Sequence, residues 1–230
     1  MVLMLKYRTD NLPPSFLKNR SRWSVADIPR NEKGLVMKMA KKVVFSLIFS
    51  IGVFVFPQLA FAGSYSGSNA AVYALTYCDD YNTSYVSYEA DCMNFVSQCL
   101  LAGGWSETGK YYYWSSSAWY YDGSSLVSDT WKLVEDFKDF IEGSGRASGP
   151  YTVSSSNLSS FEVGDVMLVD WTDDGTWGHA YIVTGLETNP ADVELSAHTT
   201  DRCGDITTAD IWNDHYPNAD IIGYFLYSSY

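Results

Sequence analysis

The stretch Glu89-Ala-Asp-Cys-Met-Asn-Phe-Val-Ser-Gln-Cys-Leu100 contains two of the four cysteines of this 230-residue chain. Counted from Cys92, its apolar side chains recur at i, i+3, i+4, i+7 and i+8, the pattern of a helix with one face in the core. The spacing predicts a helix over residues 91–102, closed by Gly103-Gly104. Free cysteine is among the most buried residue types, so both cysteines can be core residues.

The two cysteines are not equivalent, because only Cys92 lies in the first turn of this helix. Asp91 is a good N-cap residue, whose carboxylate can accept the backbone N–H of Asn94. The unpaired N–H groups and the positive dipole end of a helix favour a thiolate. A carboxylate that is not engaged in capping raises the pKa of a neighbouring thiol instead. Cys92 is therefore the candidate nucleophile, and Cys99 is the expected core residue.

The first 62 residues differ from the rest of the chain. Three lysines between residues 38 and 42, an apolar run over 43–56 and the sequence Ala60-Phe61-Ala62 predict a signal peptide at residues 37–62. A retained signal anchor is the alternative, although the run is shorter than the about 20 residues that span a bilayer. Signal peptides begin near the initiator methionine, so we interpret residues 1–36 as a non-translated or disordered extension. We expect a secreted protein with no stable membrane association after cleavage.

The segment that follows Ala62 is strongly acidic. Residues 63–230 hold 5 of the 15 Lys and Arg residues and 24 of the 27 Asp and Glu residues, which gives a formal charge of −19. Such a surface repels phosphate backbones, so we expect no nucleic-acid partner. It suits cationic or neutral substrates. The length suits one domain with one sizeable core, and we expect a monomer.

Export makes disulfides permissible. Cys92 and Cys99 cannot pair on one straight helix, because seven residues separate them by roughly 10 Å at 1.5 Å per residue. Cys78 and Cys203 are therefore the expected pair. Two free cysteines are the alternative.

The pattern along the chain predicts helices first and strands second. Beside 91–102, helices are expected over 69–80, with Asn69 as N-cap, and from about 129 to 142; strands are expected over 163–171, 179–184, 193–198 and 221–227. Residues 63–68 form a short leader and residues 144–160 a Gly/Ser/Pro-rich connection. This order predicts an α+β domain over 69–230, with N-terminal helices packed on an antiparallel sheet. The aromatic segment 111–121 is either a substrate platform or a cover for the core.

A thiolate nucleophile needs a base, normally histidine. His179 begins one predicted strand and His198 ends the next. In a symmetric hairpin about positions 188 and 189 the two histidines face each other, with Cβ atoms about 5 Å apart. One imidazole can then orient the other, as in a catalytic triad. A register slip of one residue puts them on opposite faces.

Five motifs occur in order and together resemble a known family. They are Asp91-Cys92-x-Asn94-Phe95-Val96-Ser97-Gln98-Cys99-Leu100, Ala102-Gly103-Gly104, Val163-Gly-Asp165, Gly178-His179 and Ala197-His198-Thr199-x-Asp201-Arg202. This set closely resembles the "putative amidase" domain family, which is related to NlpC-type and CHAP peptidases of the papain-like superfamily. The resemblance covers nearly all of residues 69–230.

The resemblance implies a papain-like α+β fold of the NlpC/CHAP type and hydrolysis of amide bonds, often in cell-wall peptides. By that resemblance Cys92 matches the nucleophile, His179 the general base and His198 the orienting residue, with Asp201 as the alternative orienting group. The backbone N–H of Cys92 would help to hold the oxyanion. No metal or organic cofactor is implied. The basic wall-binding repeats common beside such domains do not occur in this sequence, which weakens the cell-wall assignment.

Three functions are consistent with these residues. The first is a secreted cysteine amidase or peptidase that acts on peptides or cell-wall peptides through a thioester. The second is a non-catalytic module that binds a wall fragment or a peptide with the same fold. The third is an acyltransferase, in which an amine rather than water resolves the thioester.

Overall fold

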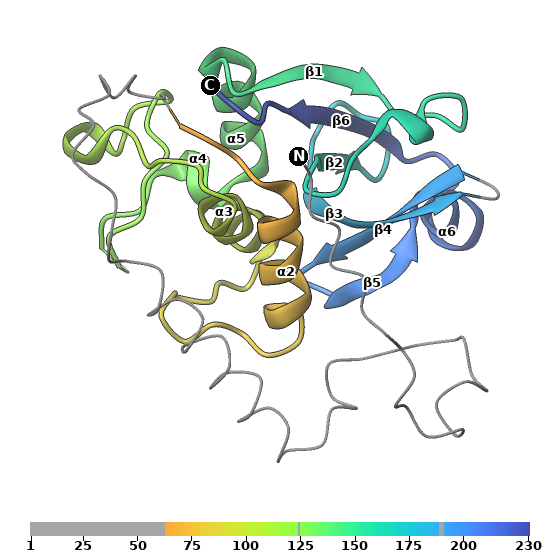
Figure 1. Cartoon of the computed structure of the whole chain (residues 1–230), viewed down its shortest axis with the longest axis horizontal. Helices are drawn as coiled ribbons and strands as arrows, with labels where there is room; N and C mark the ends of the chain where they lie inside the picture. The colour runs from red at the N-terminus through yellow and green to blue at the C-terminus, as the bar shows by residue number, and fades with distance from the viewer. Residues whose placement is uncertain (1–62, 124, 189–190) are drawn as a thin grey trace, which may run out of the picture. The chain divides into compact units, whose positions relative to one another are not determined.

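The computed structural model describes residues 63–230 except 124, 189 and 190. The predicted signal peptide and the extension before it therefore lie outside the described residues. The helices are α2 (Gly67–Tyr77), α3 (Cys92–Ala102), η3 (Lys110–Tyr112), α4 (Asp129–Lys132), α5 (Val134–Ser144), η4 (Leu158–Ser160), α6 (Thr208–Asp210) and η5 (Ile211–His215). The strands are β1 (Ala147–Thr152), β2 (Val166–Asp170), β3 (His179–Thr188), β4 (Ala191–Ala197), β5 (Arg202–Thr207) and β6 (Asp220–Leu226) (Figure 1). Within the described part of the chain, no helix is both long and apolar enough to cross a bilayer.

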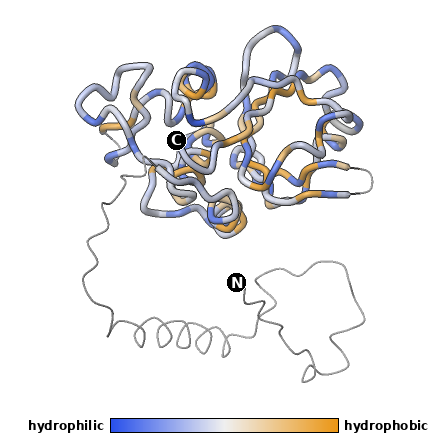
Figure 2. The backbone as a smooth tube through the Cα atoms, turned by 45° about the horizontal axis from the view of Figure 1, so that its top comes forward, coloured by the Kyte–Doolittle hydropathy of each residue, from blue (hydrophilic) through white to orange (hydrophobic). Residues whose placement is uncertain are grey.

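The six strands form one antiparallel sheet in the order β1-β6-β2-β3-β4-β5. Side chains alternate between its two faces. Val166 and Leu168 of β2 join the core that the helices share, whereas Met167 and Val169 join a second core on the opposite face. In Figure 2 the apolar parts of the chain concentrate in these strands and in the helices that pack on them. The chain is thus an α+β domain, as predicted from the order of its elements.

Helix α3 lies at the centre of the helical layer. The prediction gave it one core-facing stripe, but all nine residues from Cys92 to Leu100 are buried. Its polar side chains are hydrogen-bonded instead of solvated. Asn94 Oδ1 accepts from Trp131 Nε1 at 2.8 Å, and Ser97 Oγ accepts from Trp119 Nε1 at 3.0 Å. Aromatic residues from the segment after α3, Trp119 and Trp131 of α4, therefore cover this helix.

The start of α2 differs from the prediction by three residues. Ser66, not Asn69, is the N-cap, and its Oγ accepts the backbone N–H of Asn69 at 3.3 Å. The following Gly67 packs directly on the turn of the Val163-Gly-Asp165 motif: a Cβ on Gly67 would lie 1.9 Å from the carbonyl oxygen of Val163. Gly164 itself has a φ of +98°, which favours glycine. These two glycines let the backbone of α2 pack directly against the backbone of the turn before β2, with no side chain between them.

The predicted third helix is two helices. Leu133 is extended, with φ −113° and ψ 133°, and separates α4 from α5. Because of this break, the side chains of Trp131 and Phe137 point in directions relative to each other that one continuous helix would not give them. Trp131 reaches α3 and the ring of Trp119, while Phe137 packs with Phe140 on the far side of the break.

Two strands were missed, and they are the two edges of the sheet. β1 lies in the segment that we expected to be a connection, and β5 follows the last predicted hairpin. Most residues of both strands are partly or fully exposed, so neither has an alternating apolar pattern. Pro150 in β1 is typical of an edge position, because proline has no N–H to donate to a neighbouring strand.

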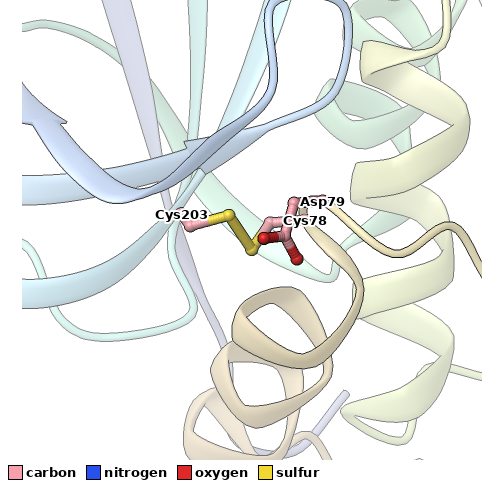
Figure 3. A group of neighbouring side chains, drawn as sticks. All are labelled: Cys78, Asp79 and Cys203. Atoms are coloured by element: carbon pink, nitrogen blue, oxygen red, sulfur yellow. A yellow bond between two sulfur atoms is a disulfide. The ribbon is translucent and has the colours of Figure 1, made fainter. Parts of the chain in front are cut away.

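A disulfide joins the end of α2 to the edge strand β5. Cys78 and Cys203 are 125 residues apart in sequence, and their Cα atoms are 5.4 Å apart (Figure 3). This is the pair that we expected, and Cys92 and Cys99 are free and buried. The bond ties together elements from the beginning and the end of the domain.

Loss of this disulfide should lower the free energy of unfolding. Closing a loop of this length restricts the unfolded chain, and removal of a native disulfide typically costs about 2–5 kcal/mol. We expect a loss in this range for the Cys78→Ser/Cys203→Ser variant in guanidinium denaturation. Dithiothreitol should destabilise the wild type by a similar amount and should not change the stability of the variant. Equal stability of the oxidised and reduced wild type would contradict this assignment.

Candidate active site

Asp91 occupies the N-cap position of α3, but it does not make the predicted capping bond to Asn94 N–H. Its carboxylate accepts three other hydrogen bonds. Oδ1 accepts from the backbone N–H of Tyr88 at 2.8 Å and from Asn94 Nδ2 at 2.9 Å. Oδ2 lies 2.6 Å from Nδ1 of His198. The carboxylate therefore links the loop before α3 to the end of β4.

The Cys92 side chain, at the first position of α3, is only 4% exposed. Burial raises the pKa of its thiol, and the charge of Asp91 adds a smaller increase; hydrogen bonds from the backbones of Ala180 and Met93 act in the opposite direction. We expected the helix terminus to favour a thiolate. Burial outweighs that effect in this structure, and the expectation of a low-pKa thiol was wrong for the state described.

His179 is the first residue of β3, directly before the Ala180 backbone that contacts the Cys92 thiol. Its imidazole is 6% exposed, and burial lowers its pKa to about 4, so it is neutral near pH 7. The ring packs edge-on against Tyr181, with centroids 4.6 Å apart, and lies 5.5 Å from the ring of Trp171. Within the described residues, neither of its nitrogens hydrogen-bonds to a protein group, including the Cys92 sulfur.

His198 does not face His179, which corrects the predicted pairing. Thr184 is an extra residue in β3, so the register between β3 and β4 changes there, and Ile182 lies opposite Ser196. Continued to the end of the hairpin, this register sets Ala180, not His179, opposite His198. The two imidazoles consequently lie on different faces of the sheet: His198 contacts Phe95 of the helical core, whereas His179 contacts Tyr181 of the second core.

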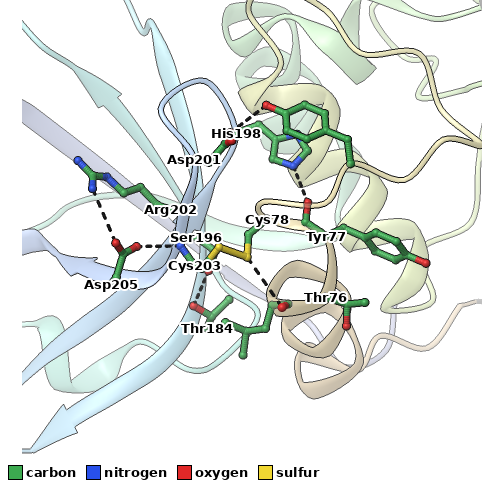
Figure 4. Close-up of a disulfide and its surroundings, with 12 residues drawn as sticks. Thr76, Tyr77, Cys78, Thr184, Ser196, His198, Asp201, Arg202, Cys203 and Asp205 are labelled. Carbon is green, nitrogen blue, oxygen red and sulfur yellow. Dashed lines mark hydrogen bonds and ion pairs between the residues drawn. A yellow bond between two sulfur atoms is a disulfide. The ribbon is translucent and has the colours of Figure 1, made fainter. Parts of the chain in front are cut away.

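Asp201, the alternative orienting residue, also has another partner. Its Oδ1 accepts a hydrogen bond from the hydroxyl of Tyr81 at 2.9 Å. Figure 4 shows Asp201 beside His198, whose Nε2 points to the carbonyl oxygen of Tyr77, the residue before the disulfide-bonded Cys78. Neither predicted orienting group contacts His179. The aromatic rings of Trp171 and Tyr181 position its imidazole instead.

A pocket of about 350 Å³ opens beside His179. Its wall is mostly aromatic and aliphatic, with one basic residue, Arg202, and it includes Trp171, Tyr181, Thr200 and Ile206. This volume falls at the lower end of the range for small-ligand pockets. Cys92 is not part of the wall, so the pocket reaches the candidate base but not the buried thiol.

The turn between β4 and β5 holds Thr199, a residue of the family motif for which the sequence predicted no role. Thr199 and Thr200 have φ values of +62° and +71°, a left-handed conformation that threonine rarely adopts. Thr199 Oγ1 accepts the backbone N–H of Asp91 at 2.7 Å, which fixes the turn against the start of α3. Two consecutive threonines where hairpin turns usually have Asn-Gly were the available signal.

The aromatic segment 111–121 divides into two parts. Trp119 and Tyr120 are buried, whereas Tyr111, Tyr112 and Trp114 are 80%, 65% and 68% exposed. The second half of the segment therefore covers the core, as one interpretation expected. The first half presents rings to solvent, and its role as a substrate platform stays a prediction.

One group in the described part of the chain brings three potential metal ligands within 4.8 Å of one another, namely Cys78, Asp79 and Cys203 (Figure 3). Zinc and related ions bind cysteine as the thiolate. Both sulfurs of this group are joined in the disulfide, which removes two of the three ligands. We assign no metal to it.

Comparison with known proteins gives a family for the chain. It is 29% identical over 126 residues to "Uncharacterized protein YhbB" of Bacillus subtilis (strain 168), an alignment that covers 55% of this chain and 39% of that protein. No solved structure matches significantly. Residues 64–222, which include Cys92, His179 and His198, match the family described as "Putative amidase domain". The chain therefore belongs to the putative amidase domain family.

Proposed function

We propose that this protein is a secreted, cysteine-dependent amide hydrolase of the papain-like type, with Cys92 as nucleophile and His179 as general base. The observation that carries the proposal is the position of the Cys92 thiol, which adjoins the backbone next to His179 at the start of α3. The membership of an amidase family supports amide hydrolysis as the reaction. The predicted signal peptide supports export. The pocket wall beside His179 combines aromatic and aliphatic side chains with threonines and Arg202, which supports a peptide substrate.

The reaction would use these groups in two steps. The Cys92 sulfur attacks the amide carbonyl carbon while its proton passes to His179, and the backbone N–H of Cys92 helps to hold the oxyanion. His179 then gives this proton to the leaving amine as the C–N bond breaks, which leaves a thioester. Water, deprotonated by His179, attacks the thioester carbon, releases the acid and restores the thiol.

This cycle needs the thiol and the imidazole within hydrogen-bond distance. They are not hydrogen-bonded in the structure, and catalytic hydrogen bonds often form only when substrate is bound. The neutral state of His179 is the one that a base requires. Cell-wall peptides are the substrate class that we propose to test first, with other peptides as the alternative.

Replacement of either proposed catalytic residue should abolish hydrolysis. For Cys92→Ala and His179→Ala we expect kcat/KM to fall by at least about a thousandfold, because each removes a group that bonds to the reacting atoms or carries their proton. The measurement is digestion of purified peptidoglycan and of model peptides, with mass spectrometry of the fragments.

Cys99→Ala is the matched control, since it removes the other free, buried thiol of the same helix. It should retain wild-type activity apart from a loss of stability. Full activity of Cys92→Ala would rule out Cys92 as the nucleophile. An equal loss of activity in Cys92→Ala and in the control Cys99→Ala would also rule it out. Addition of amines during the digestion distinguishes hydrolysis from acyl transfer, which would give amine-linked products.

Burial of His179 as a neutral imidazole predicts a pH dependence of stability. Its pKa is about 4 in the folded state and about 6.5 when unfolded, so between these values the unfolded chain binds more protons. Its stabilising contribution is complete above pH 6.5 and is lost as the pH falls toward 4. Asp165 has the opposite effect in the same window, because burial raises its pKa to about 6.

The contribution of His179 can be isolated with His179→Gln, which leaves Asp165 unchanged. We expect the difference in the free energy of unfolding between wild type and this variant to shrink as the pH falls from 7 to 4, in urea denaturation. A difference that is independent of pH would show that the imidazole titrates normally and is not buried in the neutral form.

A second candidate function is a non-catalytic module that binds a wall fragment or a peptide. Two observations favour it: the thiol is buried without a hydrogen bond to an imidazole in the described residues, and Tyr111, Tyr112 and Trp114 present exposed rings. Rapid alkylation of Cys92 by iodoacetamide near neutral pH would favour the enzyme. Ordinary thiol reactivity together with ligand binding that is lost in Trp114→Ala would favour the module.

A further inference from the structure

Both ring nitrogens of His198 face hydrogen-bond acceptors. Nε2 lies 2.8 Å from the carbonyl oxygen of Tyr77, and Nδ1 lies 2.6 Å from Oδ2 of Asp91. A carbonyl oxygen can only accept, so Nε2 must carry a hydrogen. A second proton must then lie between Nδ1 and the carboxylate, either on the imidazole or on Asp91. His198 cannot act as a base in this arrangement, since neither nitrogen is a free acceptor.

The surroundings place that second proton on the imidazole. The other oxygen of Asp91 accepts hydrogen bonds from Tyr88 N–H and Asn94 Nδ2, which stabilise an ionised carboxylate. The imidazole lies between the rings of Tyr81 and Phe95, with centroids 3.7 and 4.0 Å away and nearly parallel planes. Aromatic faces on both sides stabilise a cation. The pair is therefore an imidazolium and a carboxylate.

This ion pair is almost completely buried, with side chains 1% and 2% exposed. An isolated charge at such a position is strongly disfavoured, and removal of one partner leaves the other uncompensated. The uncompensated charge would matter for Cys92, because Asp91 precedes it directly and already contributes to the raised pKa of its thiol.

We propose that His198 is a positioning residue that cancels the charge of Asp91 and thereby keeps the Cys92 thiol able to ionise. This role differs from orientation of His179, and it rests on the proposed function of Cys92 as nucleophile. Thr199, the residue after His198, contributes to the same arrangement. Its hydroxyl oxygen accepts a hydrogen bond from the backbone N–H of Asp91.

Other titratable groups face this region from the neighbouring elements. In β3, Tyr181 interacts electrostatically with Cys92, and His179 precedes the Ala180 backbone beside the Cys92 thiol. Burial raises the pKa of Tyr181 to about 12 and lowers that of His179 to about 4, so both are neutral near pH 7. The carboxylate of Asp201 accepts a hydrogen bond from the hydroxyl of Tyr81, whose ring stacks on the imidazole of His198.

The test compares the reactivity of the Cys92 thiol in three variants of the full mature protein. In His198→Gln the carboxylate of Asp91 keeps its charge without the cation, and a like charge within about 4–6 Å raises a pKa by about one unit or more. We expect iodoacetamide alkylation of Cys92 between pH 7 and 8 to be about tenfold slower than in the wild type. In Asp91→Asn the pair is uncharged, because a neutral His198 can still donate to Tyr77, and the rate should stay near or above that of the wild type.

The double variant Asp91→Asn/His198→Gln provides the decisive comparison. It removes both charges, so it should restore alkylation to within about twofold of the wild type although two native side chains are lost. A purely structural role predicts the reverse, with the double variant as perturbed as His198→Gln or more. Ser97→Ala is the control for a lost buried hydrogen bond on α3, and it should leave the pH profile of alkylation unchanged. Peptide mapping assigns the alkylated residue.

A measurement on the wild type keeps the inference testable where a variant does not fold. In 15N-histidine NMR spectra of the folded protein at pH 7, His198 should show hydrogens on both nitrogens, as its two acceptor contacts require, while His179 should show one. A singly protonated His198, or wild-type alkylation of a folded His198→Gln, would overturn the inference. Alkylation reports the thiol alone: the expected pattern without any amide hydrolysis would refute the proposed function and leave this inference standing. Amide hydrolysis by the wild type, together with a wild-type rate of Cys92 alkylation in His198→Gln, would support the proposed function and refute this inference.

Discussion

The burial of the first nine residues of α3, Cys92 to Leu100, is the constraint on which the rest of the domain depends. A helix buried over this length must find partners for its polar side chains, and Asn94 and Ser97 find them in the indole N–H groups of Trp131 and Trp119. The chain breaks at Leu133 between α4 and α5, and Trp131 reaches Asn94 from the first of these helices. Helix α3 therefore organises the aromatic region after it as well as the sheet beneath it.

The same burial determines the chemistry at the start of α3. A solvated helix terminus would favour the thiolate of Cys92, but desolvation opposes any charge at this depth. The ion pair of Asp91 and His198 is compatible with that depth because its two charges cancel. The proposed mechanism thus pairs a neutral base, His179, with a neutral thiol, and the carboxylate of Asp91 next to that thiol has its own counterion. In this proposal, proton transfer between two neutral groups coincides with attack on the substrate.

The sequence predicted the elements that carry strong local patterns and missed those that depend on distant ones. The apolar spacing of Cys92, Phe95 and Cys99 was sufficient to locate α3, and the motif order was sufficient to identify the family. The buried positions of the polar residues Asn94 and Ser97 in α3 could not be predicted locally, because their indole partners lie 37 and 22 residues further along the chain. The edge strands β1 and β5 have little apolar pattern, since they are not covered on both sides.

The candidate site residues stay predictions, and the structure corrects the pairing that we expected among them. A symmetric hairpin brings His179 and His198 together, and one extra residue, Thr184, is enough to move them to opposite faces. Nothing local marks that bulge except Gly185, where a Cβ would lie 2.1 Å from the carboxylate of Glu194. The Asp91 carboxylate was expected to cap α3 by a local bond, whereas its strongest partner lies 107 residues away.

The Thr199-Thr200 turn has a consequence for attempts to make this protein more robust. Asn-Gly is the pair that best tolerates two left-handed residues in a hairpin, so a stabilisation screen would select it at these positions. The same exchange would delete the hydroxyl that receives the backbone N–H of Asp91. Heat resistance gained in the hairpin would then come with a looser attachment of the helix that carries Cys92, and selection for thermal tolerance alone would not detect the loss.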